Sequence, residues 1–315
     1  MDMHVPQELL TYASANARAT TVESTEFFFS EQLSSQYDRN QCAMWLRWRP
    51  SPRPNFNPEL LRDLDRYCNF MSLSRGTVDC QGEQRSMEYA VLASNAPGVF
   101  NLGGDLKLFK GLIDTQDRNG LLDYGRACVE VLHRNYVGYG LPITTISLVQ
   151  GECLGGGFEA ALSSDVIVAE RHSRFGFPEI IFNLFPGMGA YSFLERKTGK
   201  RTTEELLCSG RLYSADDMLA LGVVDLVVDT GSGEAEVANL IRSRSRNRNA
   251  MTGIAAARRR VHKLDCEELM DVVEIWVDTA LNLGIRDLKL MQRLISRQNA
   301  FSTHPNTNVP VRQLH

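Results

Sequence analysis

Two glutamates and two glycine clusters are the residues of this sequence whose types and spacing could do chemistry. Glu159 follows the run Gly155-Gly-Gly157, and Glu179 lies in the apolar stretch Phe175-Gly-Phe-Pro-Glu-Ile-Ile181. A second glycine pair occurs in Phe100-Asn-Leu-Gly-Gly-Asp-Leu106. Carboxyl groups take up and release protons, and glycine backbones can expose N–H groups to a developing negative charge. The combination indicates acid–base chemistry beside an oxyanion site.

The glycine run at 155–157 connects a predicted strand to a predicted helix. The first N–H groups of a helix lack intrahelical partners and lie at the positive end of its dipole, so they suit an anion. Gly156 is placed to supply one such donor, and Glu159 projects from the same edge of the helix. The alternative is that the glycines only allow tight helix–strand packing and that Glu159 is an acid favoured by the dipole. This motif alone leaves both interpretations open.

The other two motifs are weaker when taken singly. An isolated Gly103-Gly-Asp105 favours a plain turn between a strand and a helix. Glu179, flanked by Phe177, Pro178 and Ile180, is either exposed on a loop or held in a hydrophobic pocket. Burial would raise its pKa toward the range useful for proton transfer, but on its own the stretch favours exposure.

Short apolar strands alternate with helices around these motifs. We predict strands at 42–49, 87–94, 143–149, 165–169 and 223–228, and helices at 58–68, 121–133 and after Ser214 as an N-cap. This alternation predicts an α/β fold with crossover connections. Helical periodicity then continues through 234–248, 250–262, 266–284 and 286–298. We expect a leader of uncertain order at 1–22, a core at 23–232, a C-terminal helical region at 233–298 and a flexible tail at 299–315.

Composition narrows the class of protein. The 315 residues carry 34 Lys and Arg against 38 Asp and Glu, a formal net charge of −4, which is a poor match for a nucleic-acid binder. The chain has neither a signal peptide nor the roughly 18 apolar residues of a membrane span, so we expect a cytoplasmic protein without membrane insertion. The seven cysteines are scattered and form no C-x-x-C pair, and His133 and His172 lack metal-ligand spacing. We expect no metal and no cofactor.

Taken in order, the motifs resemble the crotonase (enoyl-CoA hydratase/isomerase) superfamily over about residues 90–230. The resemblance implies a spiral of ββα units. It also implies that the backbone N–H groups of Gly104 and Gly156 are the two oxyanion donors and that Glu159 and Glu179 are the acid–base pair. Many crotonase relatives keep one of these acids or neither, so the presence of both favours hydration or dehydration.

Longer strings over about residues 85–298 look like the synthases of diffusible signal factor (RpfF-type). These strings are Val99–Leu106, Leu121–Tyr124, Gly155–Leu162, Leu184–Phe193 and Glu274–Ala280. The resemblance implies dehydration of a 3-hydroxyacyl thioester on acyl carrier protein and hydrolysis to a free cis-2-unsaturated fatty acid. Leu102 stands where CoA-dependent crotonases usually have alanine beside the thioester, which is compatible with a carrier-protein substrate. The resemblance also implies a trimer-based homo-oligomer and a sensor-kinase receiver domain as a possible partner.

An acyl chain would need an apolar pocket. Candidate lining residues are Leu102, Phe158, Phe175, Phe182, Leu184, Phe185, Met188 and Trp276, although core packing is favoured for any one of them. A basic stretch from Arg242 to Lys263 either attracts an acidic carrier protein or is a solvated helix face, and the latter is favoured. Two other functions stay open: an enoyl-CoA hydratase or isomerase acting on CoA esters, and a non-catalytic acyl-binding or signalling protein.

Overall fold

A mixed eight-stranded sheet runs through the computed structural model, which describes residues 17–21, 24–80 and 82–303. In order across the sheet the strands are β1 (Ala17–Thr21), β2 (Ser24–Ser30), β3 (Leu33–Asp38), β4 (Ala43–Trp48), β7 (Tyr89–Ser94), β9 (Thr144–Val149), β11 (Val166–Glu170) and β14 (Leu226–Val228). Neighbours from β1 to β4 are antiparallel, whereas those from β4 to β14 are parallel. The parallel strands β7, β9 and β11 are almost wholly buried, as expected for strands covered on both faces.

The chain alternates between the large sheet and a second, smaller sheet. It contains β8 (Val99–Asn101), β10 (Glu152–Leu154), β12 (Arg174–Gly176) and β13 (Tyr213–Ser214) in the order β13-β12-β10-β8. Each of β7, β9 and β11 is followed by one strand of this sheet and then by helical chain. Those helices are α3 (Leu106–Asp114) and α4 (Arg118–Tyr136), then α5 (Gly156–Leu162), then η2 (Glu179–Phe182), α6 (Ala190–Thr198) and α7 (Lys200–Ser209). The predicted α/β spiral of ββα units is confirmed.

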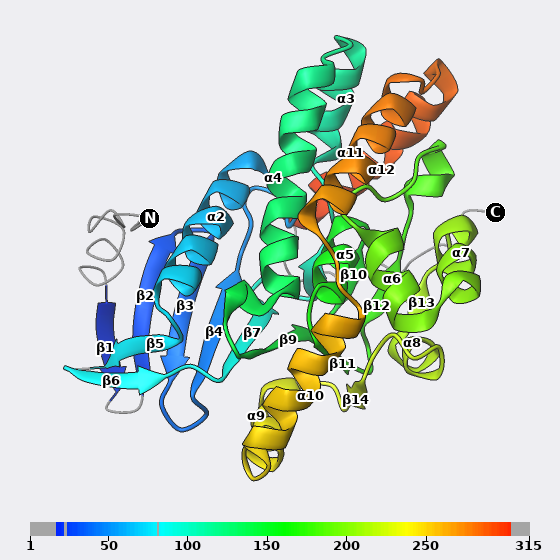
Figure 1. Cartoon of the computed structure of the whole chain (residues 1–315). Coiled ribbons are helices and arrows are strands. Elements are labelled where there is room, and N and C mark those ends of the chain that lie inside the picture. The colour runs from blue at the N-terminus through cyan, green and yellow to red at the C-terminus, as the bar shows by residue number, and fades with distance from the viewer. Residues whose placement is uncertain (1–16, 22–23, 81, 304–315) are drawn as a thin grey trace.

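Two long helices, α2 (Pro58–Leu73) and α4, lie across one face of the large sheet (Figure 1). Helix α2 begins where the side chain of Asn57 accepts a hydrogen bond from the N–H of Leu60, with Pro58 at its first position. The predicted N-cap Ser214 is confirmed, because it forms a capping box with Asp217 at the start of α8 (Ala215–Ala220). A short hairpin of β5 (Thr77–Cys80) and β6 (Glu83–Ser86) and the 3-10 turn η1 (Gly138–Gly140) complete this part.

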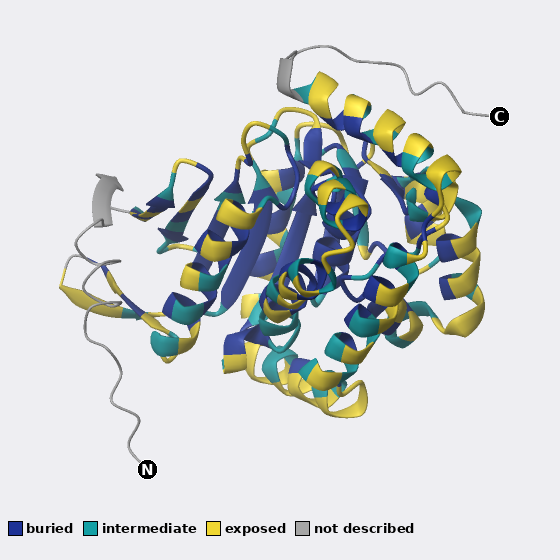
Figure 2. Cartoon of the chain, turned by 90° about the horizontal axis from the view of Figure 1, so that it is seen from above, coloured by how far each residue is buried: buried dark blue, intermediate teal, exposed yellow. Residues whose placement is uncertain are grey.

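The C-terminal region is helical, as predicted. It consists of α9 (Gly233–Ser245), α10 (Arg248–Val261), α11 (Cys266–Leu281) and α12 (Ile285–Thr303). Helix α11 packs along α4, and α12 lies beside α3 and η2 (Figure 1). The view in Figure 2 shows the buried strands enclosed by helices whose outer faces are exposed. Within the described ranges, no helix is both long and apolar enough to cross a bilayer.

The structure differs from the expectations at both ends of the chain, and it contains a hairpin that was not expected. Residues 17–21 of the predicted leader form β1, which pairs with β2. The β2–β3 hairpin was not predicted, because the run Phe27-Phe-Phe29 hides the alternation in which only the middle ring is exposed. The predicted flexible tail begins inside α12, which continues to Thr303. Residues 1–16 and 304–315 lie outside the described residues.

Candidate active site

An apolar cleft lies where the ends of β8 and β10 meet η2 and α11. It holds about 550 Å³ of space between atoms, including the solvent at its open mouth. It is lined by Leu102, Gly104, Leu106, Phe109, Tyr124, Gly125, Gly156, Glu159, Pro178, Glu179, Phe182, Leu184, Pro186, Gly187, Met188 and Trp276. The cleft therefore brings together the two glycines and the two glutamates that the sequence singled out.

The Gly156 amide stands at the first position of α5. The carbonyl of Gly155 accepts hydrogen bonds from the N–H groups of Phe158 (2.9 Å) and Glu159 (3.0 Å), so it points along the helix. Since the C=O and N–H of a trans peptide point in opposite directions, the Gly156 N–H points out of the helix. Gly155 adopts φ 51° and ψ −127°, a conformation that favours glycine.

The Gly104 amide is oriented in the same way by a second fixed carbonyl. The C=O of Gly103 accepts a hydrogen bond from the N–H of Phe56 at 2.8 Å, which turns the Gly104 N–H to the opposite side. A Cβ atom on Gly156 would lie 3.4 Å from the nitrogen of Gly104, so the two amides are neighbours. Across the described part of the chain, neither amide donates a hydrogen bond to a protein acceptor. Together they have the character of an oxyanion hole.

Glu159 lies in the first turn of α5 and is 1% exposed. Its Oε1 accepts hydrogen bonds from the backbone N–H groups of Met188 (2.7 Å) and Ala190 (2.9 Å), which anchor the chain before α6. Burial raises the pKa of Glu159 to about 8, the negative charge of Glu179 adds to the rise, and the two amide donors act against it. The two amides hold the carboxyl group in place, and its pKa of about 8 lets it exchange a proton near neutral pH.

Glu179 is the first residue of η2. Its carboxyl group is not exposed: Oε2 is buried and has no hydrogen-bond partner among the described residues. Oε1 lies against the backbone of Gly155, where a Cβ atom would come within 2.4 Å of it. Burial raises the pKa of Glu179 to about 7. The exposed loop position that the local sequence favours is therefore wrong for this carboxyl group.

Aromatic rings close the apolar side of the cleft. The ring of Phe109 makes edge-to-face contacts with Tyr124 (4.9 Å between centroids) and Trp276 (5.0 Å). The Tyr124 hydroxyl accepts a hydrogen bond from the N–H of Asp105 (3.2 Å) and donates one to the carbonyl of Phe56. Tyr124 thus joins this wall to the loop that carries Gly104.

Some predicted pocket residues line the cleft and others do not. Leu102, Phe182, Leu184, Met188 and Trp276 do. Phe158 is fully buried behind it, stacked on Phe177 at 4.8 Å and edge-to-face with Phe175, because its side chain leaves α5 on the core side. Phe175 and Phe185 are likewise absent from the lining.

Sequence reasoning missed the wall contributed by α3. Leu106, Phe109 and Ile113 follow one another at helical spacing after the N-cap Asp105, a signal that could have identified this helix.

The basic stretch is partly engaged in ion pairs. Arg248 pairs with Glu88, and Arg258 and Arg259 both pair with Asp165. In the ranges that the structure describes, no group of three His, Cys, Asp or Glu side chains is arranged to hold a metal ion.

Comparisons with known proteins agree with this architecture. The family model for enoyl-CoA hydratase/isomerase matches residues 79–268, which include both glycines and both glutamates. Enoyl-CoA hydratase from Bacillus halodurans has a TM-score of 0.69 at 20% identity over 84% of this chain and 100% of its own. Human mitochondrial delta3-delta2-enoyl-CoA isomerase gives 0.67 at 19% identity over 85% and 98%. Pseudomonas aeruginosa DspI gives 0.63 at 19% identity over 80% and 93%. The chain belongs to the enoyl-CoA hydratase/isomerase family.

Proposed function

We propose that this protein makes a cis-2-unsaturated fatty acid of the diffusible signal factor type. It would dehydrate a 3-hydroxyacyl thioester on acyl carrier protein and hydrolyse the resulting enoyl thioester. The observation that carries the proposal is the presence of two buried carboxyl groups in one apolar cleft with two unengaged backbone amides. The finer assignment within the family rests on the sequence resemblance to the signal synthases.

The dehydration step needs a base, an acid and an oxyanion site. Glu179, whose Oε2 has no hydrogen-bond partner among the described residues, takes the proton from C2. Charge then develops on the thioester oxygen, where the Gly104 and Gly156 amides stabilise it; one such donor is typically worth about 2.7–4 kcal/mol. Protonated Glu159 donates to the departing C3 hydroxyl, and the products are a 2-enoyl thioester and water. A proton returned from Glu179 to Glu159 through that water restores the pair.

The hydrolysis step reuses the same groups. A water oxygen attacks the thioester carbonyl carbon while a carboxylate of the pair accepts the water proton. The tetrahedral oxyanion lies at the two amides, the C–S bond breaks, and the thiol leaves with the proton. The products are the free acid and the carrier's thiol.

The carrier, the partner and the assembly are parts of the proposal. Leu102 lines the cleft at the position where CoA-dependent crotonases usually have alanine, and this bulkier side chain favours a carrier-protein thioester over a CoA ester. Large apolar side chains on the C-terminal helices are exposed, among them Ile254 (54%), Val261 (77%) and Ile275 (59%), which supports assembly of trimers through these helices. A receiver domain of a sensor kinase is proposed as a regulatory partner from the same resemblance.

The decisive experiment is product analysis by mass spectrometry. Purified protein is incubated with 3-hydroxydodecanoyl-carrier protein and, separately, with the matching CoA ester. We expect free cis-2-enoic acid from the carrier-protein substrate with the wild type. Glu159→Gln and Glu179→Gln should each lose it, and Glu195→Gln, an exposed glutamate on α6, should retain it.

The alternative functions give different products. Reversible hydration of the CoA ester without release of free acid would indicate an enoyl-CoA hydratase, which the family assignment favours as the second candidate. Binding of the acyl chain without turnover of either substrate would indicate an acyl-binding protein and would contradict the proposed enzyme.

A further inference from the structure

We propose that Gln298, on the last helix α12, is a positioning residue that holds the Gly104 amide in its oxyanion-binding orientation. Its side-chain Nε2 donates hydrogen bonds to the carbonyl of Leu102 at 3.2 Å and to the carbonyl of Gly104 at 3.1 Å. The side chain is 5% exposed. Gln298 lies outside the segment 79–268 that matches the family and is not one of the cleft-lining residues.

The two carbonyls that Gln298 binds flank the peptide unit that carries the Gly104 N–H. That unit is held on one side by Phe56, whose N–H donates to the Gly103 carbonyl, and the Leu102 N–H donates to the carbonyl of Pro54 at 2.8 Å. Gly103 has a φ of 88° and, like Gly104, lacks a side chain that would restrict rotation. Without Gln298 the Gly-Gly unit keeps the contact to Phe56 and the hydrogen bond from the Gly103 N–H to Oδ1 of Asn101 at 2.8 Å, but both carbonyls that flank the Gly104 N–H lose their donor, so the Gly104 N–H is held less firmly toward the cleft.

The orientation of the Gln298 amide is itself fixed. Its Oε1 accepts a hydrogen bond from Nδ2 of Asn55 at 3.4 Å, and Asn55 is 1% exposed. With its oxygen turned toward Asn55, the glutamine must present Nε2 to the two carbonyls. An ionised glutamate at this position has no donor for either carbonyl, so a neutral side chain that both donates and accepts is required.

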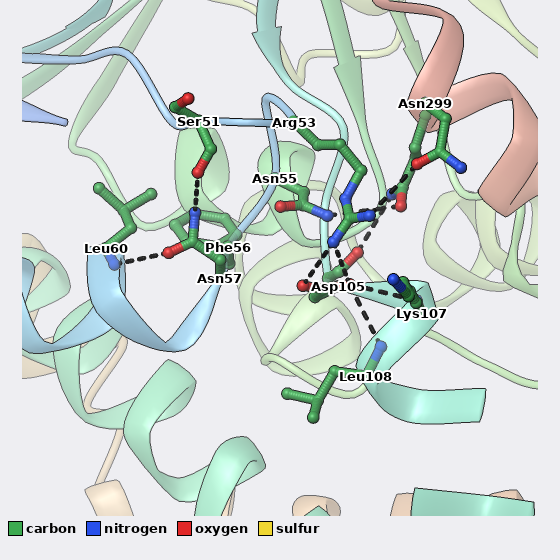
Figure 3. A network of polar contacts seen from close by, with 12 residues as sticks. Ser51, Arg53, Asn55, Phe56, Asn57, Leu60, Asp105, Lys107, Leu108 and Asn299 are labelled. Atoms are coloured by element: carbon green, nitrogen blue, oxygen red, sulfur yellow. Dashed lines mark hydrogen bonds and ion pairs between the residues drawn. The ribbon is translucent and has the colours of Figure 1, made fainter. Parts of the chain in front are cut away.

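Asn299, the residue after Gln298, also connects α12 to the segment of residues 53–57 and, through it, to the loop of residues 102–105. Figure 3 shows Arg53 between Asp105 and Asn299: it donates to Oδ1 of Asn299 at 3.2 Å and forms an ion pair with Asp105 at 3.2 Å. Asp105 directly follows Gly104 and caps α3 through the N–H groups of Lys107 and Leu108. Helix α12 therefore contacts the loop of residues 102–105 directly through Gln298 and indirectly through Asn299, by way of Arg53.

The proposal depends on the proposed function only in using the Gly104 amide, which dehydration, hydration and thioester hydrolysis would share. A first test needs no substrate. Hydrogen–deuterium exchange of the peptide covering residues 101–108 should become roughly tenfold faster in Gln298→Ala, because the carbonyls of Leu102 and Gly104 lose their buried donor. Gln292→Ala, an exposed position on the same helix, should exchange like the wild type. Unchanged exchange in Gln298→Ala would overturn the proposal.

A second test reads the oxyanion site directly. Dodec-2-enoyl-pantetheine labelled with ¹³C at the carbonyl is bound to the Glu159→Gln/Glu179→Gln protein, and its carbonyl resonance is recorded. A thioester held by the two amides should shift downfield, and adding Gln298→Ala should remove most of that shift, whereas Gln292→Ala should leave it.

Adding Gln298→Glu to the Glu159→Gln/Glu179→Gln protein distinguishes a role in positioning the Gly104 amide from a role in packing alone. A protonated glutamate can still donate one hydrogen bond, so the carbonyl shift should persist at low pH and fade as the pH rises. A shift that survives in both Gln298 variants at every pH would overturn the proposal. A probe that is unshifted before Gln298 is changed would contradict the proposed use of the amides instead, and the exchange result would then decide on Gln298 alone.

Discussion

Glu159 and Glu179 share one buried cleft, so their protons are coupled and the pair ionises in two steps. The base must be ionised and the acid protonated, so activity should rise with pH through the lower step and fall through the upper one. Because burial raises both pKa values, to about 7 and about 8, we expect a bell-shaped kcat/KM profile centred near the interval between them. Steady-state kinetics from pH 5 to 9 test this. A profile that is flat below pH 6 would contradict the buried dyad.

The same carboxyl groups make folding stability depend on pH. In the folded chain they hold protons that the unfolded chain releases above its ordinary pKa of 4.5, so stability should fall as pH rises from there toward 7 or 8. The slope is at most about 1.4 kcal/mol per pH unit for each group. Glu159→Gln/Glu179→Gln should therefore gain stability relative to the wild type between pH 5 and pH 7 in urea unfolding. The exposed Glu195→Gln should show no such trend, and a constant difference for the double variant would contradict the raised pKa values.

At the residue scale, the sequence could identify groups whose chemistry is local. Gly104, Gly156 and Glu159 are recognisable because glycines and an acid stand at the start of a predicted helix. The burial of Glu179 could not be predicted from its own stretch, because it depends on the approach of Gly155 from another unit. Gln298 carries no local signal, since its role depends on hydrogen bonds across 194 and 196 residues.

At the scale of elements, helices α4 and α11 approach each other closely at Gly125. A Cβ atom on Gly125 would lie 2.5 Å from Cγ1 of Val273, and a valine in a helix has little rotamer freedom to move away. Gly125→Ala should therefore destabilise the protein by about 1–3 kcal/mol. Gly111→Ala, in α3 with open space around it, should stabilise by about 0.5–1 kcal/mol, as glycine to alanine normally does in a helix. Urea unfolding of both variants measures the sign of each change in the free energy of unfolding. If both variants were more stable than the wild type, the tight contact at Gly125 would be refuted.

Element prediction succeeded where a pattern was long enough to show a period. The buried parallel strands and the C-terminal helices were predicted, with ends that shifted by a few residues. The strands β8, β10 and β12 have three residues each, which is too short for alternation to appear, yet they build the small sheet that leads into the site.

At the scale of the whole molecule, ion pairs of different burial link distant segments. Arg53 and Asp105 are 15% and 8% exposed at their side chains, whereas Arg118 pairs with Glu274 and Asp278 at the surface. Arg53→Met leaves a nearly buried carboxylate without its cation and should cost about 3 kcal/mol. Arg118→Met should cost little, and that little should fade in salt. Thermal unfolding at low and high ionic strength separates the two; equal losses would contradict the difference in burial.

Because the ribosome makes the chain from the N-terminus, the contact of Gln298 with the loop of residues 102–105 forms only late in synthesis. The whole segment that identifies the family is complete at residue 268, thirty residues before Gln298 is added. A nascent chain or a truncated product ending between Ala280 and Gln298 would hold every motif that the sequence singled out, Glu274–Ala280 included, and still lack the side chain that sets the Gly104 amide. The oxyanion site would thus become complete only when the last helix has been added.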